Sequence, residues 1–159
     1  MTNPDDLVEL LRTRSGLSID DEGRFLHEGE PISHERTLEV LWRSLARGPD
    51  GRWIVRIGRE TAYVEVRDTP FVVRAVGGLE AGGHPWILLA DGHREPLDPA
   101  TLRVDAEGLL RCTVKGSAPA RFSRAAHAAL GAALDESPEG SGAYVLELAG
   151  RRWPVLHAE

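Results

Sequence analysis

Three stretches of the chain have apolar residues at helical spacing, and the stretches between them show the period of two that is typical of strands. Residues 5–14 form the first stretch, and we expect a short helix that stops at Gly16. The runs on either side of Asp20–Gly23 predict a β-hairpin, because a glycine can take the positive φ that tight turns often need. A second helix is predicted to begin at Ser33, its N-cap, and to bury a stripe made of Leu38, Leu41, Trp42 and Leu45.

Strand patterns follow this helix as far as a glycine-rich segment. Residues 52–57, 61–66 and 71–76 alternate or run apolar, and we expect them to form an antiparallel meander. Four of the seven residues from Gly77 to Gly83 are glycine, which indicates a loop or the joint between two halves. A further strand pair is expected on either side of the dipeptide Asp91-Gly92, a common hairpin turn.

The chain then repeats its earlier order of elements. The segment LSIDDEG at 17–23 aligns with LRVDAEG at 102–108, and each copy precedes a strand, a Gly/Pro break and a serine-capped helix. The second cap is Ser123, and the stripe of its helix consists of Ala126, Leu130, Ala133 and Leu134. Each helix is followed by a turn and a further strand, at residue 51 and again at residue 142. We interpret the doubled turn as an internal repeat and not as two catalytic carboxylate sites.

The repeat leads to a prediction of the fold. Neither unit is large enough to bury its apolar face alone, so we expect the two to share a core. The predicted class is α+β, with two pseudo-repeated hairpin–helix–strand units, antiparallel sheets and one helix per half. The expected organisation is an N-terminal helix in residues 1–15, a first half in residues 16–80 and a second half in residues 81–159.

The composition is that of a globular protein. Of the 159 residues, 42% are hydrophobic and 28% are charged. The formal net charge of -6 argues against nucleic acid as a general partner. No apolar run approaches the roughly 20 residues of a membrane helix, so we expect no membrane association. The opening MTNPDDLVELL has neither the basic nor the long apolar region of a secretory signal, and we expect a cytoplasmic location.

The basic residues and the single cysteine add to this description of the composition. The basic residues are eighteen arginines and the single lysine Lys115. Arginine suits bidentate phosphate contacts, but a GC-rich bacterial genome produces the same bias, and we favour that explanation. The single cysteine, Cys112, excludes an internal disulfide and a cysteine-based zinc site, and its alternating neighbours predict a buried thiol.

Motifs for catalysis are absent from the sequence. It contains no phosphate-binding loop, dinucleotide fingerprint, HExxH zinc motif or GxSxG nucleophile motif, so we expect no cofactor and name no catalytic residue. The turn that carries His27, Glu28, Glu30 and His34 is a candidate ligand site. A metal or acid–base cluster is an alternative there, as is a solvated turn beside a helix cap.

Three further residues are candidates for ligand binding. Asp68 precedes a Thr-Pro turn, where it either fixes the turn through backbone N–H groups or lies at the mouth of a pocket. Phe71 closes that motif, and His84 flanks the strand of Trp86, where it can line a pocket. The complete set of candidates is His27, Glu28, Glu30, His34, Asp68, Phe71 and His84.

Two of these motifs, HEGEPI at 27–32 and DTPF at 68–71, together with the strands of residues 51–73 and EPLDP at 95–99, resemble the bacterial domain-of-unknown-function family number 1285. The resemblance covers about residues 16–155. It implies a fold with repeated structural motifs and a role in signal transduction or ligand sensing. It implies no catalytic residues.

Three classes of function follow from these observations. We favour a non-catalytic module that binds an unidentified small molecule or protein partner, as a monomer or a homodimer, because packed repeats create clefts in which pockets form. The first alternative is a small hydrolase-like enzyme with a His/Glu/Asp site, which requires these groups to converge. The second alternative is a structural scaffold with a self-associating surface.

Overall fold

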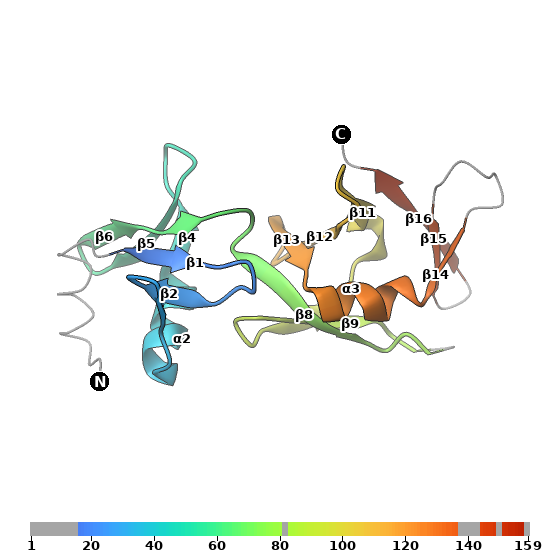
Figure 1. Ribbon diagram of the computed structural model, residues 1–159, viewed down its shortest axis with the longest axis horizontal. Coiled ribbons are helices and arrows are strands. Elements are labelled where there is room, and N and C mark those ends of the chain that lie inside the picture. Colours follow the sequence, from blue (N-terminus) through green and yellow to red (C-terminus); the bar gives the residue numbers. More distant parts are fainter. Residues whose placement is uncertain (1–15, 81–82, 137–143, 149–150, 158–159) are drawn as a thin grey trace. The chain divides into compact units, whose positions relative to one another are not determined.

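The computed structural model in Figure 1 describes residues 16–80, 83–136, 144–148 and 151–157, so the helix predicted within residues 1–15 lies outside the described part. The chain divides between Pro70 and Phe71 into two units, residues 1–70 and 71–159. The α+β class is confirmed: the described residues contain two α-helices and one short 3₁₀-helix among many strands. No described helix is both long enough and apolar enough to cross a bilayer.

The described part of the first unit, residues 16–70, contains one helix and two small sheets. Its elements are β1 (Leu17–Ile19), β2 (Phe25–His27), β3 (Glu30–Pro31), α2 (Glu35–Ser44), β4 (Leu45–Arg47), β5 (Trp53–Ile57), β6 (Glu60–Tyr63) and β7 (Glu65–Val66). One sheet has the order β3-β2-β1-β7, in which β7 runs parallel to β1. The other has the order β4-β5-β6 and is antiparallel. The predicted hairpin of residues 17–27 is confirmed by the pairing of β1 with β2.

The helix α2 begins one residue later than the sequence predicts. Its N-cap is His34 and not Ser33, because the Nδ1 atom of His34 accepts a hydrogen bond from the backbone N–H of Thr37 at 3.3 Å. A ring nitrogen here replaces the side-chain oxygen that usually caps a helix. The helix also ends earlier, since Leu45 already belongs to β4.

The apolar stripe of α2 covers the core of the first unit. Leu41 is fully buried, and Leu38, Trp42 and Leu45 pack against the same cluster. The Phe25 ring meets the Trp42 ring edge to face, with 4.7 Å between the centroids. The buried members of this cluster are Leu17, Ile19, Phe25, Leu41, Val55, Ala62 and Val64. Alternation along β1 and β5 therefore places one side of each small sheet against α2.

The second unit is built on one large sheet. Its elements are β8 (Phe71–Gly77), β9 (Trp86–Leu89), β10 (Arg94–Pro96), η1 (Pro99–Thr101), β11 (Arg103–Val104), β12 (Leu110–Val114), β13 (Ala118–Phe122), α3 (Arg124–Gly131), β14 (Leu134–Glu136), β15 (Tyr144–Leu148) and β16 (Arg151–His157). The strand order is β10-β9-β8-β13-β12-β11-β16-β15-β14. The pairs β8–β13 and β11–β16 are parallel and the others antiparallel, so the sheet is mixed.

The predicted meander of three strands is right for β5 and β6 and wrong for residues 71–76. These residues form β8, which pairs with β9 and β13 in the second unit. Phe71, Val72 and Val73 are all buried, which is typical of a central strand with both faces covered. The run FVV therefore marks a central strand in the sheet of the second unit. The meander prediction places it in one sheet with β5 and β6.

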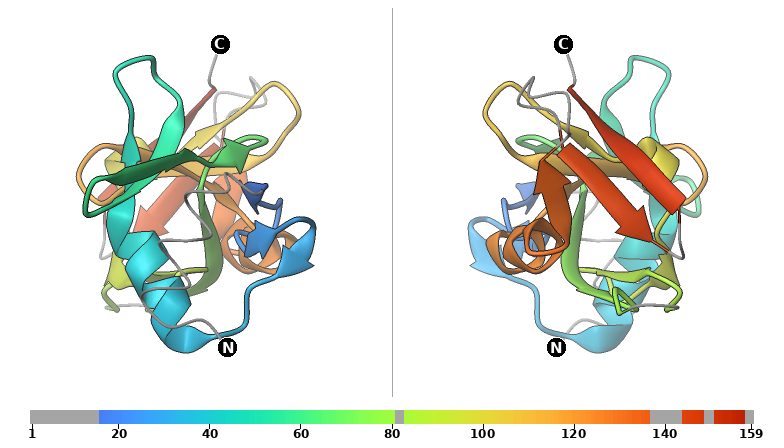
Figure 2. Two further views of the ribbon diagram at one scale, coloured as in Figure 1. Left: turned by 90° about the vertical axis from the view of Figure 1, so that its left-hand side faces the viewer. Right: turned by 90° about the vertical axis from the view of Figure 1, so that its right-hand side faces the viewer.

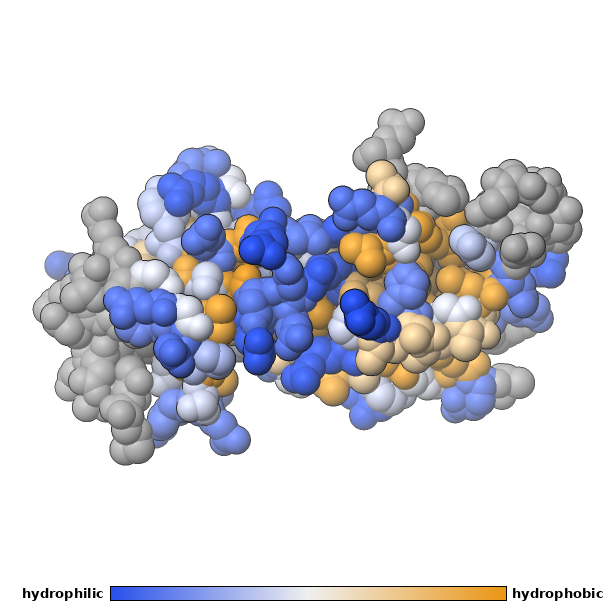
Figure 3. Space-filling model, in the orientation of Figure 1, coloured by the Kyte–Doolittle hydropathy of each residue, from blue (hydrophilic) through white to orange (hydrophobic). Residues whose placement is uncertain are grey.

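The helix α3 packs against β8 and β13 (Figure 2). Its predicted cap is confirmed, because the Ser123 hydroxyl accepts a hydrogen bond from the backbone N–H of Ala126 at 3.2 Å. Ala126 and Leu130 are the buried residues of this helix. Its exposed side carries Arg124 and the alanines Ala125, Ala128 and Ala129, and Figure 3 shows pale orange, moderately hydrophobic atoms over this helix.

The internal repeat extends to the pairing of the strands. In the first unit β1 pairs antiparallel with β2 and parallel with β7, the strand that follows the hairpin β5–β6. In the second unit β11 pairs antiparallel with β12 and parallel with β16, the last strand of the hairpin β15–β16. In each unit the helix lies between the two hairpins in sequence. The doubled turn is therefore the turn of the first hairpin in each of two repeats, and the repeats share the same pattern of strand pairing.

The sulfur of Cys112 lies in the core, as the alternation of β12 predicts. The residue is fully buried, and desolvation raises the pKa of its thiol to about 12. A thiol with this pKa is protonated at neutral pH, and thiolate is the reactive form. Cys112 thus packs as a small apolar side chain.

Candidate functional site

The seven candidate residues are divided between the two units. His27, Glu28 and Glu30 lie on the β2–β3 hairpin, and His34 caps α2. Asp68 is exposed near the end of the first unit, whereas Phe71 and His84 belong to the second. Their role in ligand binding stays a prediction, and none of them lines either of the two hollows described below.

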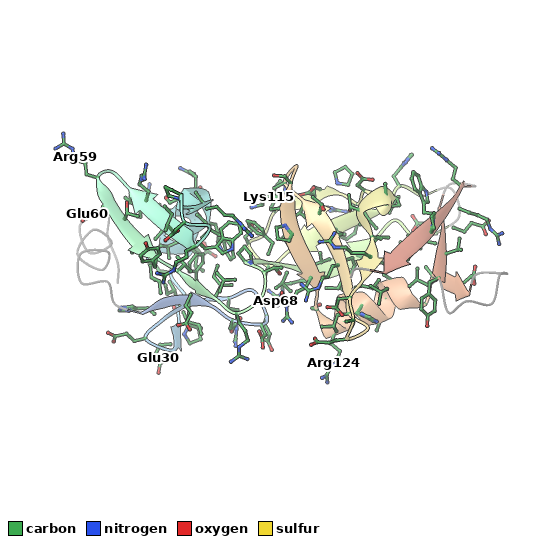
Figure 4. All side chains as sticks on the ribbon, turned by 90° about the horizontal axis from the view of Figure 1, so that it is seen from above. Glu30, Arg59, Glu60, Asp68, Lys115 and Arg124 are labelled. Carbon is green, nitrogen blue, oxygen red and sulfur yellow. The ribbon has the colours of Figure 1, made fainter. Side chains whose placement is uncertain are left out.

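The His/Glu turn offers little for a metal ion. Glu28 and Glu30 are exposed, and Glu30 points away from the unit (Figure 4). The Nδ1 atom of His34 is engaged by Thr37, while the Nε2 atom of His27 is buried without a hydrogen-bond partner. Among the described residues no three His, Cys, Asp or Glu side chains converge as a metal-binding group.

Phe71 takes part in a contact with the single lysine. The Lys115 ammonium lies 4.4 Å from the centroid of the Phe71 ring and pairs with Asp91 at 2.5 Å. The Asp91 side chain is almost fully buried, and its other oxygen accepts the backbone N–H of His93. This contact ties the tip of the β12–β13 hairpin to the β9–β10 turn.

The doubled turn has the same hydrogen bonds in both copies. One oxygen of Asp20 accepts the backbone N–H groups of Glu22 and Arg24, and its other oxygen binds Arg24 Nε at 2.8 Å. One oxygen of Asp105 likewise accepts the N–H groups of Glu107 and Leu109, and the other binds Arg111 Nε at 2.8 Å. The glycines at 23 and 108 have φ near +80°, 78° and 83°, which lets the chain reverse. The two carboxylates are structural, as the sequence indicates.

These bonds set the protonation of both carboxyl groups. Partial burial acts to raise the pKa of Asp20, but the N–H and guanidinium of Arg24 outweigh it and hold the pKa below its ordinary value of 3.8. Burial acts in the same way on Asp105, and there the N–H of Leu109 and the guanidinium of Arg111 lower the pKa. Both groups are ionised at neutral pH, where the bonds to arginine are charge-assisted.

Replacing either aspartate by asparagine is expected to lower the free energy of unfolding by about 1–2 kcal/mol at pH 7, because the charge-assisted bonds to arginine are lost. A lowered folded-state pKa stabilises the protein above the unfolded-state pKa, and the gain is lost as the pH falls through the folded-state value. The difference between wild type and Asp105→Asn should therefore shrink below about pH 4. Urea unfolding at pH 7 and pH 3 measures this difference in the free energy of unfolding. Glu107→Gln, which alters an exposed residue of the same turn, is the control. A difference that persists unchanged at pH 3 would contradict this account.

The first hollow lies beside the Asp20 turn and has charged walls. Its volume is about 390 Å³, and it is lined by Ser18, Ile19, Asp20, Asp21, Glu22, Arg24, Leu26, Glu65 and Arg67. Arg67 pairs with Asp21 at 3.1 Å, and Arg24 pairs with Asp20. Both arginines are thus engaged by carboxylates, and a charged ligand would have to replace these pairs.

The second hollow, which we call the sheet hollow, is larger and has a more apolar lining. Its volume is about 560 Å³, and it is lined by Gly48, Pro49, Asp50, Ile54, Arg56, Thr61, Ala62 and Tyr63. Val55 and Ala62 belong to the core cluster, so the alternating neighbours Ile54 and Tyr63 lie on the opposite face of the β4-β5-β6 sheet. The tip of this sheet carries Arg59 and Glu60 (Figure 4).

Tyr63 is held in place on this face, yet 51% of its surface is exposed. Its hydroxyl donates to Asp50 Oδ2 at 3.0 Å, and the Arg52 guanidinium lies 3.7 Å from its ring centroid. The backbone N–H of Arg52 and the Tyr63 hydroxyl hold the pKa of Asp50 below its ordinary value. An aromatic ring fixed in an exposed position can stack on a planar ligand without a loss of side-chain freedom.

Arg56 adds a further positive charge to this surface. It is exposed, stands opposite Thr61 in the register, and forms no ion pair with any residue in the described part of the chain. Tyr63 and Arg56 were missed by the sequence reasoning, although the alternation of β5 and β6 places both on the face away from the core.

Solved structures with the same fold are known. One is a DUF1285 family protein from Silicibacter pomeroyi DSS-3, with a TM-score of 0.66, 19% sequence identity, and coverage of 89% of this chain and 80% of that chain. The other is a DUF1285 family protein from Shewanella baltica OS155, with a TM-score of 0.57, 12% identity, and coverage of 72% and 89%. No family model and no curated protein sequence matches the chain. The fold that the sequence resemblance implies is therefore confirmed: the chain has a DUF1285-like fold.

Proposed function

We propose that the chain is a member of the DUF1285 family and a non-catalytic binding module, whose sheet hollow takes a small organic molecule with a planar apolar part and an acidic group. The observation that carries this proposal is the exposed Tyr63 ring, fixed by Asp50 and Arg52 at the edge of a hollow of about 560 Å³. Ligand pockets typically measure about 300–1,000 Å³ and combine an apolar lining with a few polar groups.

The lining supports this ligand chemistry. Ile54 offers an apolar surface, and the Tyr63 ring offers a face for stacking. Arg56 forms no ion pair with a described residue, and it favours a carboxylate or phosphate because its guanidinium can donate two parallel hydrogen bonds. The charge of Asp50 repels an acidic group at the other end, which orients the ligand.

The wider setting is part of the proposal. The sequence resemblance implies a role in ligand sensing or signal transduction, and we propose that the chain has this role in the cytoplasm. In that role the bound molecule alters how the protein meets a partner, and no bond of the ligand is broken.

A thermal-shift experiment with phenyl phosphate, benzoate and indole-3-acetate tests the proposal. A ligand at about 100 times its dissociation constant stabilises the folded state by roughly 2.7 kcal/mol. For a unit of this size that is a rise in Tm of about 10–20 °C. Inorganic phosphate has only the acidic group of the proposed ligand, and phenol has only the planar apolar part. Each should raise the Tm much less.

Variants locate the binding. Tyr63→Ala and Arg56→Ala should each abolish the shift, whereas Arg43→Ala, which alters an exposed arginine on α2, should leave it unchanged. A shift that survives both hollow variants would overturn the assignment of the site. The absence of a shift with every one of these probes would overturn the ligand class.

A further inference from the structure

Three arginines lie side by side across the sheet of the second unit. Arg103 on β11 stands opposite Arg111 on β12, and Arg111 stands opposite Arg121 on β13. Residues that are opposite each other in register point to the same face of a sheet. Adjacent strands are about 4.8 Å apart, so this arginine row spans about 10 Å.

The row lies on the face of β12 and β13 opposite to their buried side chains. Leu110 and Cys112 flank Arg111 along β12 and are buried, as are Ala120 and Phe122 on either side of Arg121. Alternation puts the arginines on the other face, where their side chains are partly exposed. Thr113 lies two residues along from Arg111 on that face and adds a hydroxyl.

The positive charge of the row is only partly compensated. Asp105 binds Arg111 Nε at 2.8 Å, and Arg103 donates to the carbonyl oxygen of Thr101 at 3.2 Å. Arg121 forms no ion pair with any described residue, and its neighbour in the register on β8 is Val72. Arg103 and Arg121 thus have no ion-pair partner among the described residues.

Such an arrangement is costly without a ligand. Like charges directly opposite each other destabilise a sheet. A bias towards arginine codons explains the number of arginines in the chain, but it does not explain why three occupy consecutive register positions. A bound anion removes the repulsion, and the guanidinium fork matches phosphate oxygens.

We propose that the arginine row binds linked phosphate groups, as in a diphosphate. Two linked phosphates have the length to reach two neighbouring arginines at once, which one small anion does less well. The net charge of -6 disfavours a nucleic acid, whose binding depends on extended positive surface. This site is separate from the sheet hollow and does not depend on it. The linked phosphates come either from an inorganic chain or from a nucleoside diphosphate.

The test is a titration of the full chain with sodium pyrophosphate at low ionic strength, followed by calorimetry and by Tm. Sulfate at matched ionic strength is the control for general screening. Pyrophosphate should raise the Tm by several degrees and sulfate should not. ADP serves as the second arm: binding that is tighter than that of pyrophosphate assigns the nucleotide source, and equal binding assigns the inorganic one.

Variants separate binding from folding. Arg121→Gln should weaken pyrophosphate binding about tenfold or more, since a charge-assisted bond is lost. Its Tm without anion should be unchanged or higher, because a repulsive charge has been removed. Arg124→Gln, on α3 and pointing away from the unit in Figure 4, should bind like wild type. Equal Tm shifts with pyrophosphate and sulfate, or equal binding by the two variants, would overturn the proposal.

Discussion

Replacing Phe25 by alanine is expected to lower the free energy of unfolding of the first unit by about 3–5 kcal/mol. Phe25 is 1% exposed and lies in a core cluster of this unit, with its ring against that of Trp42. The substitution removes the buried ring and leaves a cavity that the short strands around it cannot close. For a unit of this size the Tm should fall by about 15 °C or more.

Thermal unfolding followed by near-ultraviolet circular dichroism measures the effect, because Trp42 loses its aromatic neighbour. Phe25→Leu should cost clearly less, since most of the volume is kept. Tyr63→Ala serves as the control for an exposed aromatic residue and should lower the Tm much less. Equal effects of Phe25→Ala and Tyr63→Ala would show that Phe25 is not a core residue.

Replacing Gly77 by alanine is expected to destabilise the second unit by about 1–3 kcal/mol. Gly77 on β8 stands opposite Trp86 on β9, and a Cβ atom there would collide with Cζ2 and Cε2 of the Trp86 ring. The ring also contacts the Arg94 guanidinium, which lies 3.7 Å from its centroid, so a shift of the ring would disturb this contact. Either the strands separate or the ring leaves its position.

Gly131→Ala is the matched control for this substitution. Gly131 ends α3, and a Cβ atom there meets nothing within 4 Å. The control should be neutral or slightly stabilising, because alanine favours helix more than glycine does. Urea unfolding of the two variants gives the comparison. A stability of Gly77→Ala equal to that of the control would mean that Trp86 does not cover Gly77.

The elements that the sequence predicted well are those with a local cause. The turn at Asp20 and its copy at Asp105 follow from an aspartate and a glycine at fixed spacing, and both form the bonds that this chemistry allows. The helices follow from apolar spacing. The exact cap of α2 was missed, because a histidine ring in place of a serine hydroxyl is a less common choice.

The predictions that failed depend on partners far away in sequence. Nothing local to residues 71–76 indicates that β8 pairs with β13, some fifty residues later. An apolar run fits a meander and a central strand equally well. The parallel pairs β1–β7 and β11–β16 likewise join the ends of each repeat.

The candidate site was hard to predict for a related reason. The sequence predicts a site from chemically reactive residue types and their neighbours, namely His27, Glu28, Glu30, His34, Asp68, Phe71 and His84. The sheet hollow instead depends on Tyr63 and Arg56. Both are common residue types, and only their position on the same face of the β4-β5-β6 sheet indicates a site. The arginine row is invisible until the register of three strands is known.

The most direct test of binding at the sheet hollow is to map phenyl phosphate on the full chain by amide chemical-shift perturbation. We predict that the perturbed amides cluster between Gly48 and Tyr63, and that Tyr63→Ala removes the perturbation. Perturbed amides confined to the second unit, or none at all at millimolar ligand, would contradict the assignment of the sheet hollow as the binding site.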